Sequence, residues 1–391
     1  MTSEWNHSTI NDVCVLVTDG SHSSPKSVND GKYMVSVKDF TDYGFDFTSC
    51  RMISNDDYET LKRNGCVPQI DDILIGKDGA RFFEDIIIYR QREKPALLSS
   101  IAILRCDKSK ILPDFLYYVL RTPSFRQDVK DNYGSGSAIP RIILKDFKRM
   151  MVSYPTLEKQ QAIISVLTAI DSKIQANTEI NDNLQQQAMS LYAEMFLNSS
   201  DSNVTSGTLS DIAVITMGQS PSGSSYNEDG VGEVFYQGRA EFGFRFPKRR
   251  LFTTEPKRMA EAGDVLLSVR APVGDLNIAY ERCCIGRGLG AIHSKTGHSS
   301  FVLYTMFALR SQLDVFNGEG TVFGSINRDA LNAIPIDIPP VTEIDQFEVA
   351  AHPIDELIRA NYEENCRLEA IRDSLLPKLM SGEIDVSAVQ L

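Results

Sequence analysis

Apolar residues recur at alternating steps of three and four in two stretches of the chain, one from Leu167 to Met195 and one from Ile354 to Leu379. This spacing keeps one face of a helix apolar and is typical of a coiled-coil seam. The seam positions are Ile170, Ile174, Asn177, Asn181, Leu184 and Leu191 in the first stretch, and Ile354, Ile358, Asn361, Asn365, Leu368 and Leu375 in the second. Arg372 interrupts the second seam, where we expect Ile371 to rotate in. We expect the two stripes to bury against each other.

The two stretches are copies of one another. Residues 170–191 align without gaps to residues 354–375 at a constant offset of 184, and ten of the 22 positions are identical. Ordinary composition would give about one or two chance identities over such a window. The chain therefore contains an internal duplication.

Both copies are predicted to be long helices. Neither holds a glycine over most of its length, and Pro155 and Pro340 stand just before them, where proline is tolerated. A helix of roughly 30–40 residues spans about 45–60 Å, which suits a spacer rod. The seam asparagines either control the register of helix pairing or face solvent, and the sequence leaves both alternatives open.

Fainter repeats surround the helices. Residues 8–13 resemble 207–212, residues 71–80 parallel 263–272, and the stretches that precede each helix, 144–155 and 328–339, share an apolar pattern. Short apolar runs separated by glycine-rich turns predict strands at 85–90, 100–106, 264–270 and 276–280, with short helices at 113–121 and 301–309. We predict a mixed α/β (α+β) fold in four segments: 1–155 and 201–340 as globular domains, 156–200 and 341–391 as helices.

Charge is distributed unevenly between these segments. The net charge is −12, but residues 1–155 carry 21 basic and 21 acidic side chains and residues 201–340 carry 13 and 15. The helical segments 156–200 and 341–391 carry 2 against 5 and 4 against 11, which places ten of the twelve excess negative charges there. The globular parts remain free to present local basic surfaces to nucleic acid.

Several kinds of chemistry find no support in the sequence. The seven cysteines form no CxxC pair and the five histidines lack two-ligand spacing, so we expect free thiols and no metal site. The only Pro-Pro, at 339–340, lacks the preceding Asn or Asp of an adenine methyltransferase, and no P-loop is present. The glycine-rich run 286–290 is either a cofactor loop or, as we favour, a tight turn. No membrane span or secretory signal is visible, so we expect a cytoplasmic protein.

The strings MGQSPSGSSYN (217–227), FYQGRAEF (235–242), GDVLLSVRAPVGDLNI (263–278) and CIGRGLGAI (284–292) resemble the target-recognition domains of Type I restriction-modification specificity subunits. The first globule resembles them more loosely through DGSHSSPK (19–26), DDILIGKDGA (71–80) and GSGSAIPRI (134–142), and RDSLLPKLMSGEIDV (372–386) resembles their C-terminal conserved region. One departure from the family is the short stretch before the first domain, which leaves little N-terminal conserved arm.

The resemblance implies a fold and a set of partners. In the family, an antiparallel coiled coil holds two target-recognition domains apart, and each domain reads a few base pairs of double-stranded DNA. Two modification (methyltransferase) subunits dock alongside, and restriction/translocase subunits join them. S-adenosylmethionine, ATP and Mg²⁺ belong to those partners, so we expect this chain to be a non-catalytic specificity subunit without a cofactor of its own.

Base reading requires polar side chains presented from rigid loops, with Arg preferred for guanine and Asn or Gln for adenine. The candidates in the first domain are Ser21, His22, Lys26, Lys77, Arg81, Ser135 and Arg141. Those in the second are Gln219, Tyr226, Gln237, Arg239, Arg270, Arg287 and Arg328. The basic run Lys248, Arg249 and Arg250 is better suited to phosphate than to bases. For each residue, a solvated surface charge or a structural hydrogen bond is the competing interpretation.

Two readers on a quasi-twofold frame predict an asymmetric, bipartite DNA site. Half-site centres one helical turn apart lie about 10 bp from each other, so half-sites of 3–4 bp leave a gap of about 6 bp. A structural or adaptor protein that assembles through its coiled coil is the alternative from another class. A solitary endonuclease or methylase is the third, and it would require turnover by the isolated chain.

Overall fold

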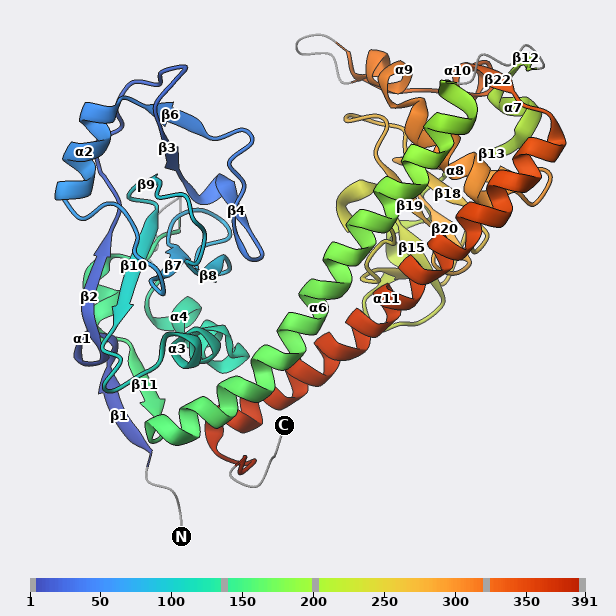
Figure 1. The fold of residues 1–391 in the computed structure, drawn as a ribbon. Coiled ribbons are helices and arrows are strands. Elements are labelled where there is room, and N and C mark those ends of the chain that lie inside the picture. Colours follow the sequence, from blue (N-terminus) through green and yellow to red (C-terminus); the bar gives the residue numbers. More distant parts are fainter. Residues whose placement is uncertain (1–4, 135–139, 199–203, 319–323, 387–391) are drawn as a thin grey trace. The chain divides into compact units, whose positions relative to one another are not determined.

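The structure is a computed structural model that describes residues 5–134, 140–198, 204–318 and 324–386. The chain divides into two compact units, one formed by Met1–Gln175 with Asn365–Leu391 and the other by Ala176–Glu364. Because the long helices α6 (Leu157–Tyr192) and α11 (Val341–Ser381) each cross a unit boundary, each unit contains one globular part and a portion of both helices (Figure 1).

An antiparallel four-stranded sheet forms the centre of the first unit, in the order β2-β10-β7-β8. Its strands are β2 (Cys14–Asp19), β10 (Ile101–Cys106), β7 (Ile73–Gly76) and β8 (Ile86–Ile88). Along β10, Ala102 and Leu104 face the core that includes helix α3 (Pro113–Arg121), whereas Ile101 and Ile103 belong to a second core on the opposite face. Both faces of the sheet are therefore buried, which explains why its strands are continuous apolar runs in the sequence.

The second unit repeats this sheet in the order β13-β21-β18-β19. Its strands are β13 (Ala213–Met217), β21 (Leu289–Ser294), β18 (Val265–Ser268) and β19 (Leu276–Ile278), and α8 (Ser299–Ala308) takes the place of α3. The strands and helices predicted from the apolar runs are confirmed. The shared strand order confirms that the duplication extends to the globular parts.

A smaller sheet accompanies each central sheet. In the first unit its order is β6 (Arg51–Ile53), β3 (Lys32–Val35) and β9 (Ala96–Leu97), beside a hairpin of β4 (Phe40–Thr41) and β5 (Gly44–Phe45). In the second unit the order is β14 (Tyr226–Asn227), β16 (Phe252–Thr253), β15 (Glu233–Tyr236), β20 (Cys283–Ile285) and β17 (Met259–Ala260). Each contains one parallel pair, β3 with β9 and β15 with β20.

Each globular part is closed by pairing between its first and last strands. β1 (Asn6–Thr9) pairs with β11 (Met151–Tyr154), and β12 (Thr205–Thr208) pairs with β22 (Pro335–Ile338). A single capped helical turn follows the first strand in each case, α1 (Ile10–Val13) and α7 (Leu209–Ile212). The remaining helices are α2 (Asn55–Arg63), α4 (Pro123–Asn132), α5 (Leu144–Arg149), α9 (Arg310–Asp314) and α10 (Arg328–Asn332).

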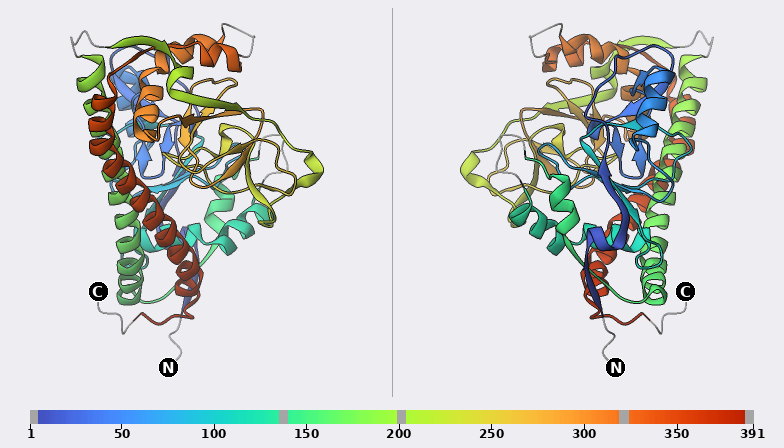
Figure 2. Two further views of the ribbon diagram at one scale, coloured as in Figure 1. Left: turned by 90° about the vertical axis from the view of Figure 1, so that its right-hand side faces the viewer. Right: turned by 90° about the vertical axis from the view of Figure 1, so that its left-hand side faces the viewer.

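The two long helices lie side by side and antiparallel within each unit (Figure 2). In the first unit, Arg372 of α11 contacts Asp171 of α6, and Asn365 contacts Ile174, so that positions rise on one helix as they fall on the other. In the second unit Asn361 contacts Asn181 and Glu364 contacts Asn177 in the same sense. The predicted burial of one stripe against the other is confirmed, and the mixed α/β class with it.

The helix seam follows the predicted heptads with one correction. Leu167, Ile174, Ile358 and Leu379 are at most 5% exposed, and the other aliphatic seam positions are half-buried. The expectation that Ile371 replaces Arg372 in the seam is wrong, since the Ile371 side chain is 49% exposed. Arg372 keeps its seam position because its guanidinium pairs with Asp171 at 3.0 Å, with only 17% of its side chain exposed.

The seam asparagines pair across the helices. Asn177 and Asn181 are 1% and 5% exposed, and Asn361 donates a hydrogen bond of 2.8 Å to the Asn181 side-chain oxygen. Asn181 donates to the Ile358 carbonyl at 3.4 Å in the second unit, and the equivalent Asn365 donates to the Ile174 carbonyl at 3.4 Å in the first. The solvent-facing alternative is therefore wrong for Asn177 and Asn181.

All seven cysteines are unbridged in the structure. Among the residues that the structure describes, no helix combines the length and apolarity needed to cross a bilayer.

Candidate nucleic-acid interface

A set of backbone hydrogen bonds recurs where the third strand of each central sheet ends. In the first unit, Ile142 N donates to the Lys77 carbonyl at 2.9 Å and Gly79 N donates to the Pro140 carbonyl at 3.0 Å. These two bonds flank an isolated bridge between Asp78 and Arg141. Loops that approach from distant parts of the sequence are thereby tied to a rigid strand.

The second unit contains the equivalent bonds. Ile326 N donates to the Val269 carbonyl at 3.1 Å, Ala271 N donates to the Gly324 carbonyl at 3.0 Å, and Arg270 forms the bridge with Ser325. Each bridge thus carries one arginine, but on opposite partners. We refer to the residues around each bridge as the loop cluster of that unit.

A hollow of about 420 Å³ opens at the loop cluster of the second unit. Four of the side chains predicted to read bases line it, namely Tyr226, Gln237, Arg270 and Arg287. They come from four different places in the sequence. The Tyr226 ring packs 4.9 Å from that of Phe235, and its hydroxyl donates to the Pro221 carbonyl at 3.1 Å, so this wall is fixed by its own contacts.

Two glycines shape the wall that carries Arg287. A Cβ on Gly286 would lie 2.9 Å from the Gln237 Cα, and one on Gly288 would lie 2.8 Å from the Gln237 carbonyl. These positions require glycine so that the two backbones can approach. The run 286–290 joins β20 to β21, whereas a dinucleotide-binding loop opens a helix. This placement supports the tight-turn interpretation.

The predicted basic residues of the second unit fall into two groups, according to whether they pair with a carboxylate. Arg239 pairs with Asp275, Arg249 with Glu281 at 2.5 Å, and Arg250 with Glu241 at 2.5 Å. The remaining predicted basic residues are exposed and, among the described residues, have no ion pair. These are Lys248, Arg270, Arg287 and Arg328. Of the uncharged candidates, Gln219 and Gln237 are exposed and Tyr226 is half-buried.

In the first unit the buried candidates are tied to one another. Lys77, 7% exposed, lies 3.3 Å from the carboxylate of Asp19, and His22 approaches the same carboxylate at 3.4 Å. Ser21 is 6% exposed and donates to the Ser23 carbonyl at 2.8 Å. These contacts give Lys77 and Ser21 structural roles that the sequence did not reveal, and their contact with bases stays a prediction.

The other candidates of the first unit lie on its surface. Lys26 and Arg141 are exposed, and Arg81 is exposed beside Asp85 at 2.6 Å. Ser135 lies outside the described residues. The structure therefore brings Ser21, His22 and Lys77 together near Arg141, which bridges to the residue after Lys77.

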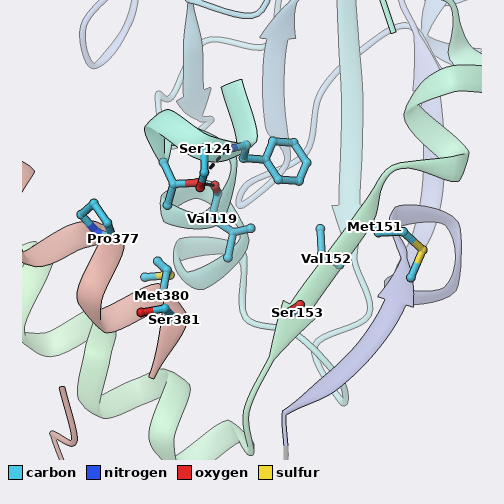
Figure 3. Close-up of a pocket in the computed structure, with 10 residues that line it drawn as sticks. Val119, Ser124, Met151, Val152, Ser153, Pro377, Met380 and Ser381 are labelled. Carbon is cyan, nitrogen blue, oxygen red and sulfur yellow. Dashed lines mark hydrogen bonds between the residues drawn. The ribbon is translucent and has the colours of Figure 1, made fainter. Parts of the chain in front are cut away.

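A second hollow, of about 280 Å³, lies in the first unit between α4, β11 and the end of α11 (Figure 3). Val119, Met151 and Met380 line it together with serine and threonine side chains. Since none of the described residues that line this hollow is charged, they offer no counter-charge to a phosphate. It is not part of the candidate interface.

Some side chains that fix the globular parts to the helices could not be recognised from the sequence. Tyr118 of α3 donates to Asp171 at 2.7 Å, and Tyr304 of α8 donates to Asp355 at 2.8 Å. Arg245, 3% exposed, also pairs with Asp355 at 3.1 Å. The identity of Asp171 and Asp355 in the aligned copies is a signal that could have revealed them, because a repeated carboxylate beside an apolar seam needs a partner.

One family of known proteins matches each half of the duplicated chain separately. The family described as "Type I restriction modification DNA specificity domain" matches residues 2–186 and again residues 201–364. Each match covers one globular part and part of a long helix.

Two relatives come from Methanocaldococcus jannaschii. A candidate MjaX specificity subunit of a type I restriction enzyme is 28% identical, with 98% of this chain and 94% of the relative covered. The MjaIX specificity subunit of a type I restriction enzyme is 24% identical, with 71% of each chain covered. Among solved structures, the S subunit of a Type I restriction-modification system from M. genitalium is 17% identical with a TM-score of 0.52, and 97% of this chain and 96% of that chain are covered. That last similarity is one of fold.

Proposed function

The chain belongs to the family of Type I restriction-modification DNA specificity proteins, and from this premise we propose that it is the subunit that selects the DNA sequence on which such an enzyme acts. The observation that carries the proposal is the loop cluster, which occurs once in each globular part with the same backbone hydrogen bonds and different side chains. A rigid frame with variable polar side chains is what base reading requires.

The proposed DNA site is bipartite and asymmetric. Each unit would read one half-site through its own loop cluster. Because the bridge is Asp78 with Arg141 in one unit and Arg270 with Ser325 in the other, the two clusters present different donors and acceptors to the groove. Two different half-sites follow from this difference.

We further propose that the long helices set the distance between half-sites and dock the partner subunits. Two modification subunits would bind alongside, and restriction subunits would join them. Methyl transfer, ATP hydrolysis and cleavage, with S-adenosylmethionine, ATP and Mg²⁺, would belong to those partners. Support for this division comes from the sequence, which has no P-loop and no adenine methyltransferase motif.

The experiment that tests the proposal is genome-wide detection of methyladenine in a host with and without the gene for this chain. We expect methylation to disappear from one gapped motif when the gene is removed. Unchanged methylation, together with purified protein that self-associates and shows no salt-dependent DNA binding, would instead support an adaptor protein.

The spacing role is tested separately by inserting or deleting one heptad in α6 together with the matching heptad in α11. The paired change keeps the seam in phase while altering helix length by about 10 Å. We expect the gap between half-sites to change or activity to be lost. An unaltered gap would refute the proposal that the helices measure the distance.

A further inference from the structure

The hollow at the second loop cluster is lined by two guanidinium groups that form no ion pair with any residue the structure describes. Arg270 and Arg287 line it and are exposed. No carboxylate among the described residues pairs with either side chain. Two such cations in one concave site make its potential positive, and an acceptor group bound there would be attracted to both.

Neighbouring arginines in the same unit differ in this respect. Arg239 and Arg310 both pair with Asp275, and Arg282 pairs with Glu233 at 2.9 Å. Their charge is already neutralised within the protein. The hollow therefore differs from these sites, because two arginines without a described carboxylate partner line it together and can both meet an external acceptor.

Both guanidinium groups are carried by backbone that cannot easily shift. Arg270 sits on the bridge to Ser325, and Arg287 lies between Gly286 and Gly288, which pack against the Gln237 backbone. The Arg287 N–H also donates to the Ser220 hydroxyl at 3.3 Å. Fixed attachment points favour the directional, two-pronged hydrogen bonds of arginine over loose attraction to a phosphate.

We propose that Arg270 and Arg287 read guanine in the half-site bound by the second unit. This inference rests on the proposed function. Guanine presents two acceptors, O6 and N7, side by side in the major groove, and a guanidinium matches them with two parallel N–H donors. Gln237, on the same wall, supplies an amide that can contact the neighbouring base.

The described residues of the first unit are arranged differently. Asp78 occupies the position of Arg270, so a carboxylate replaces one guanidinium at the equivalent bridge. A carboxylate accepts hydrogen bonds from cytosine and repels the guanine acceptors. The guanine preference that we propose for Arg270 and Arg287 should consequently belong to the half-site of the second unit.

The test uses the complex of the full-length chain with its modification subunits and selects bound sequences from a randomised DNA library. Arg287→Ala, Arg270→Ala and Arg287→Lys are compared with the native complex. Arg258→Ala is the matched control, since Arg258 is an exposed arginine of the same unit that does not line the hollow. The thermal unfolding midpoint of each variant establishes that it is folded.

We expect each alanine variant to lose about ten-fold or more of the preference for guanine at one position of a single half-site. Arg287→Lys should lose part of that preference although it keeps the charge, because an ammonium lacks the planar, parallel pair of N–H donors that matches O6 and N7. Arg258→Ala should retain every preference.

Other results would overturn the inference. A uniform loss of affinity for all sequences, reversed by Arg287→Lys and accompanied by a smaller salt dependence, would identify phosphate contacts. Loss of preference for a base other than guanine, or no change in either preference or affinity, would also overturn it. In each case the native complex would still select a gapped site, so the proposed function would stand. A native complex without any sequence preference would defeat the proposed function itself.

Discussion

Tyr304 donates a hydrogen bond of 2.8 Å to Asp355, a carboxylate on the long helix α11. The equivalent pair in the other unit is Tyr118 and Asp171, at 2.7 Å. Burial raises the pKa of both tyrosines well above the ordinary value, so each hydroxyl stays protonated and remains a donor. One ion-paired carboxylate per repeat therefore anchors a globular part to its helix pair.

The arginine that completes each anchor comes from a different place. In the first unit it is Arg372, on the opposite helix, and in the second it is Arg245, from the globular part. The position equivalent to Arg372 in the first helix copy is Ala188, which is fully buried. The two copies have thus kept the carboxylate and the tyrosine while exchanging the source of the positive charge.

We predict that Tyr118→Phe and Tyr304→Phe each lower the free energy of unfolding by about 1–3 kcal/mol, because a half-buried carboxylate loses one charged hydrogen bond. Urea unfolding midpoints measure the effect. Tyr33→Phe is the control, since the Tyr33 hydroxyl has no hydrogen bond among the described residues. Equal, small effects at all three positions would mean that the anchors add nothing to stability.

A second prediction concerns the seam asparagines. Asn181→Ala should lower the free energy of unfolding by about 1–3 kcal/mol, because Asn361 then loses its acceptor inside the helix pair. The double variant Asn181→Leu with Asn361→Leu should recover most of this loss, because no amide is left unsatisfied. The double-mutant cycle from urea unfolding measures the coupling. Additive losses would show that the two amides do not depend on one another.

A third prediction concerns acid. Hydrogen bonds from Thr9 lower the pKa of Asp12, and those from Thr208 lower the pKa of Asp211. A carboxyl group whose pKa is lowered by folding stabilises the protein at pH values above its ordinary pKa, which is near 3.8. That stabilisation is lost as the pH falls through the lower pKa that the group has in the folded protein. The double variant Asp12→Asn with Asp211→Asn should therefore show a shallower fall in unfolding midpoint between about pH 5 and pH 3. Identical pH profiles would contradict this role.

The corrected seam gives a fourth prediction. Ile371→Glu should change the free energy of unfolding by no more than about 0.5 kcal/mol, because the side chain is half-exposed. Leu379→Ala should cost about 2–5 kcal/mol, because that side chain is 1% exposed. Denaturant midpoints of the two variants check both values. A large effect of Ile371→Glu would restore the original heptad assignment.

Much of this architecture could be predicted from the sequence because it depends on local periodicity. Helix spacing and the constant offset located both long helices, and the apolar runs located strands such as β10 and β18. The order of the strands could not be predicted, because it depends on contacts between distant segments. The presence of Arg372 in the seam, in place of Ile371, could not be predicted for the same reason. The carboxylate that pairs with Arg372 is that of Asp171, on the other helix.

The candidate interface was predictable to a similar extent. Four polar residues predicted from their chemistry in the second globule do meet in one hollow, because they lie at or just beyond strand ends that backbone hydrogen bonds hold together. The burial of candidate residues in the first globule was harder to predict. Nothing near Lys77 in the sequence indicates that it is buried, since its partner Asp19 ends a different strand.

The Lys77–Asp19 pair gives the last prediction. Both side chains are only 8% exposed, and Val269 occupies the position of Lys77 in the second unit. Lys77→Met should lower the free energy of unfolding by about 3 kcal/mol, because it leaves the Asp19 carboxylate buried without its main counter-charge. Adding Asp19→Asn should recover most of that loss. If the pair is structural, the double variant will bind the native DNA site with nearly native affinity, whereas loss of site selectivity in this folded variant would show that Lys77 contacts DNA as the sequence predicted.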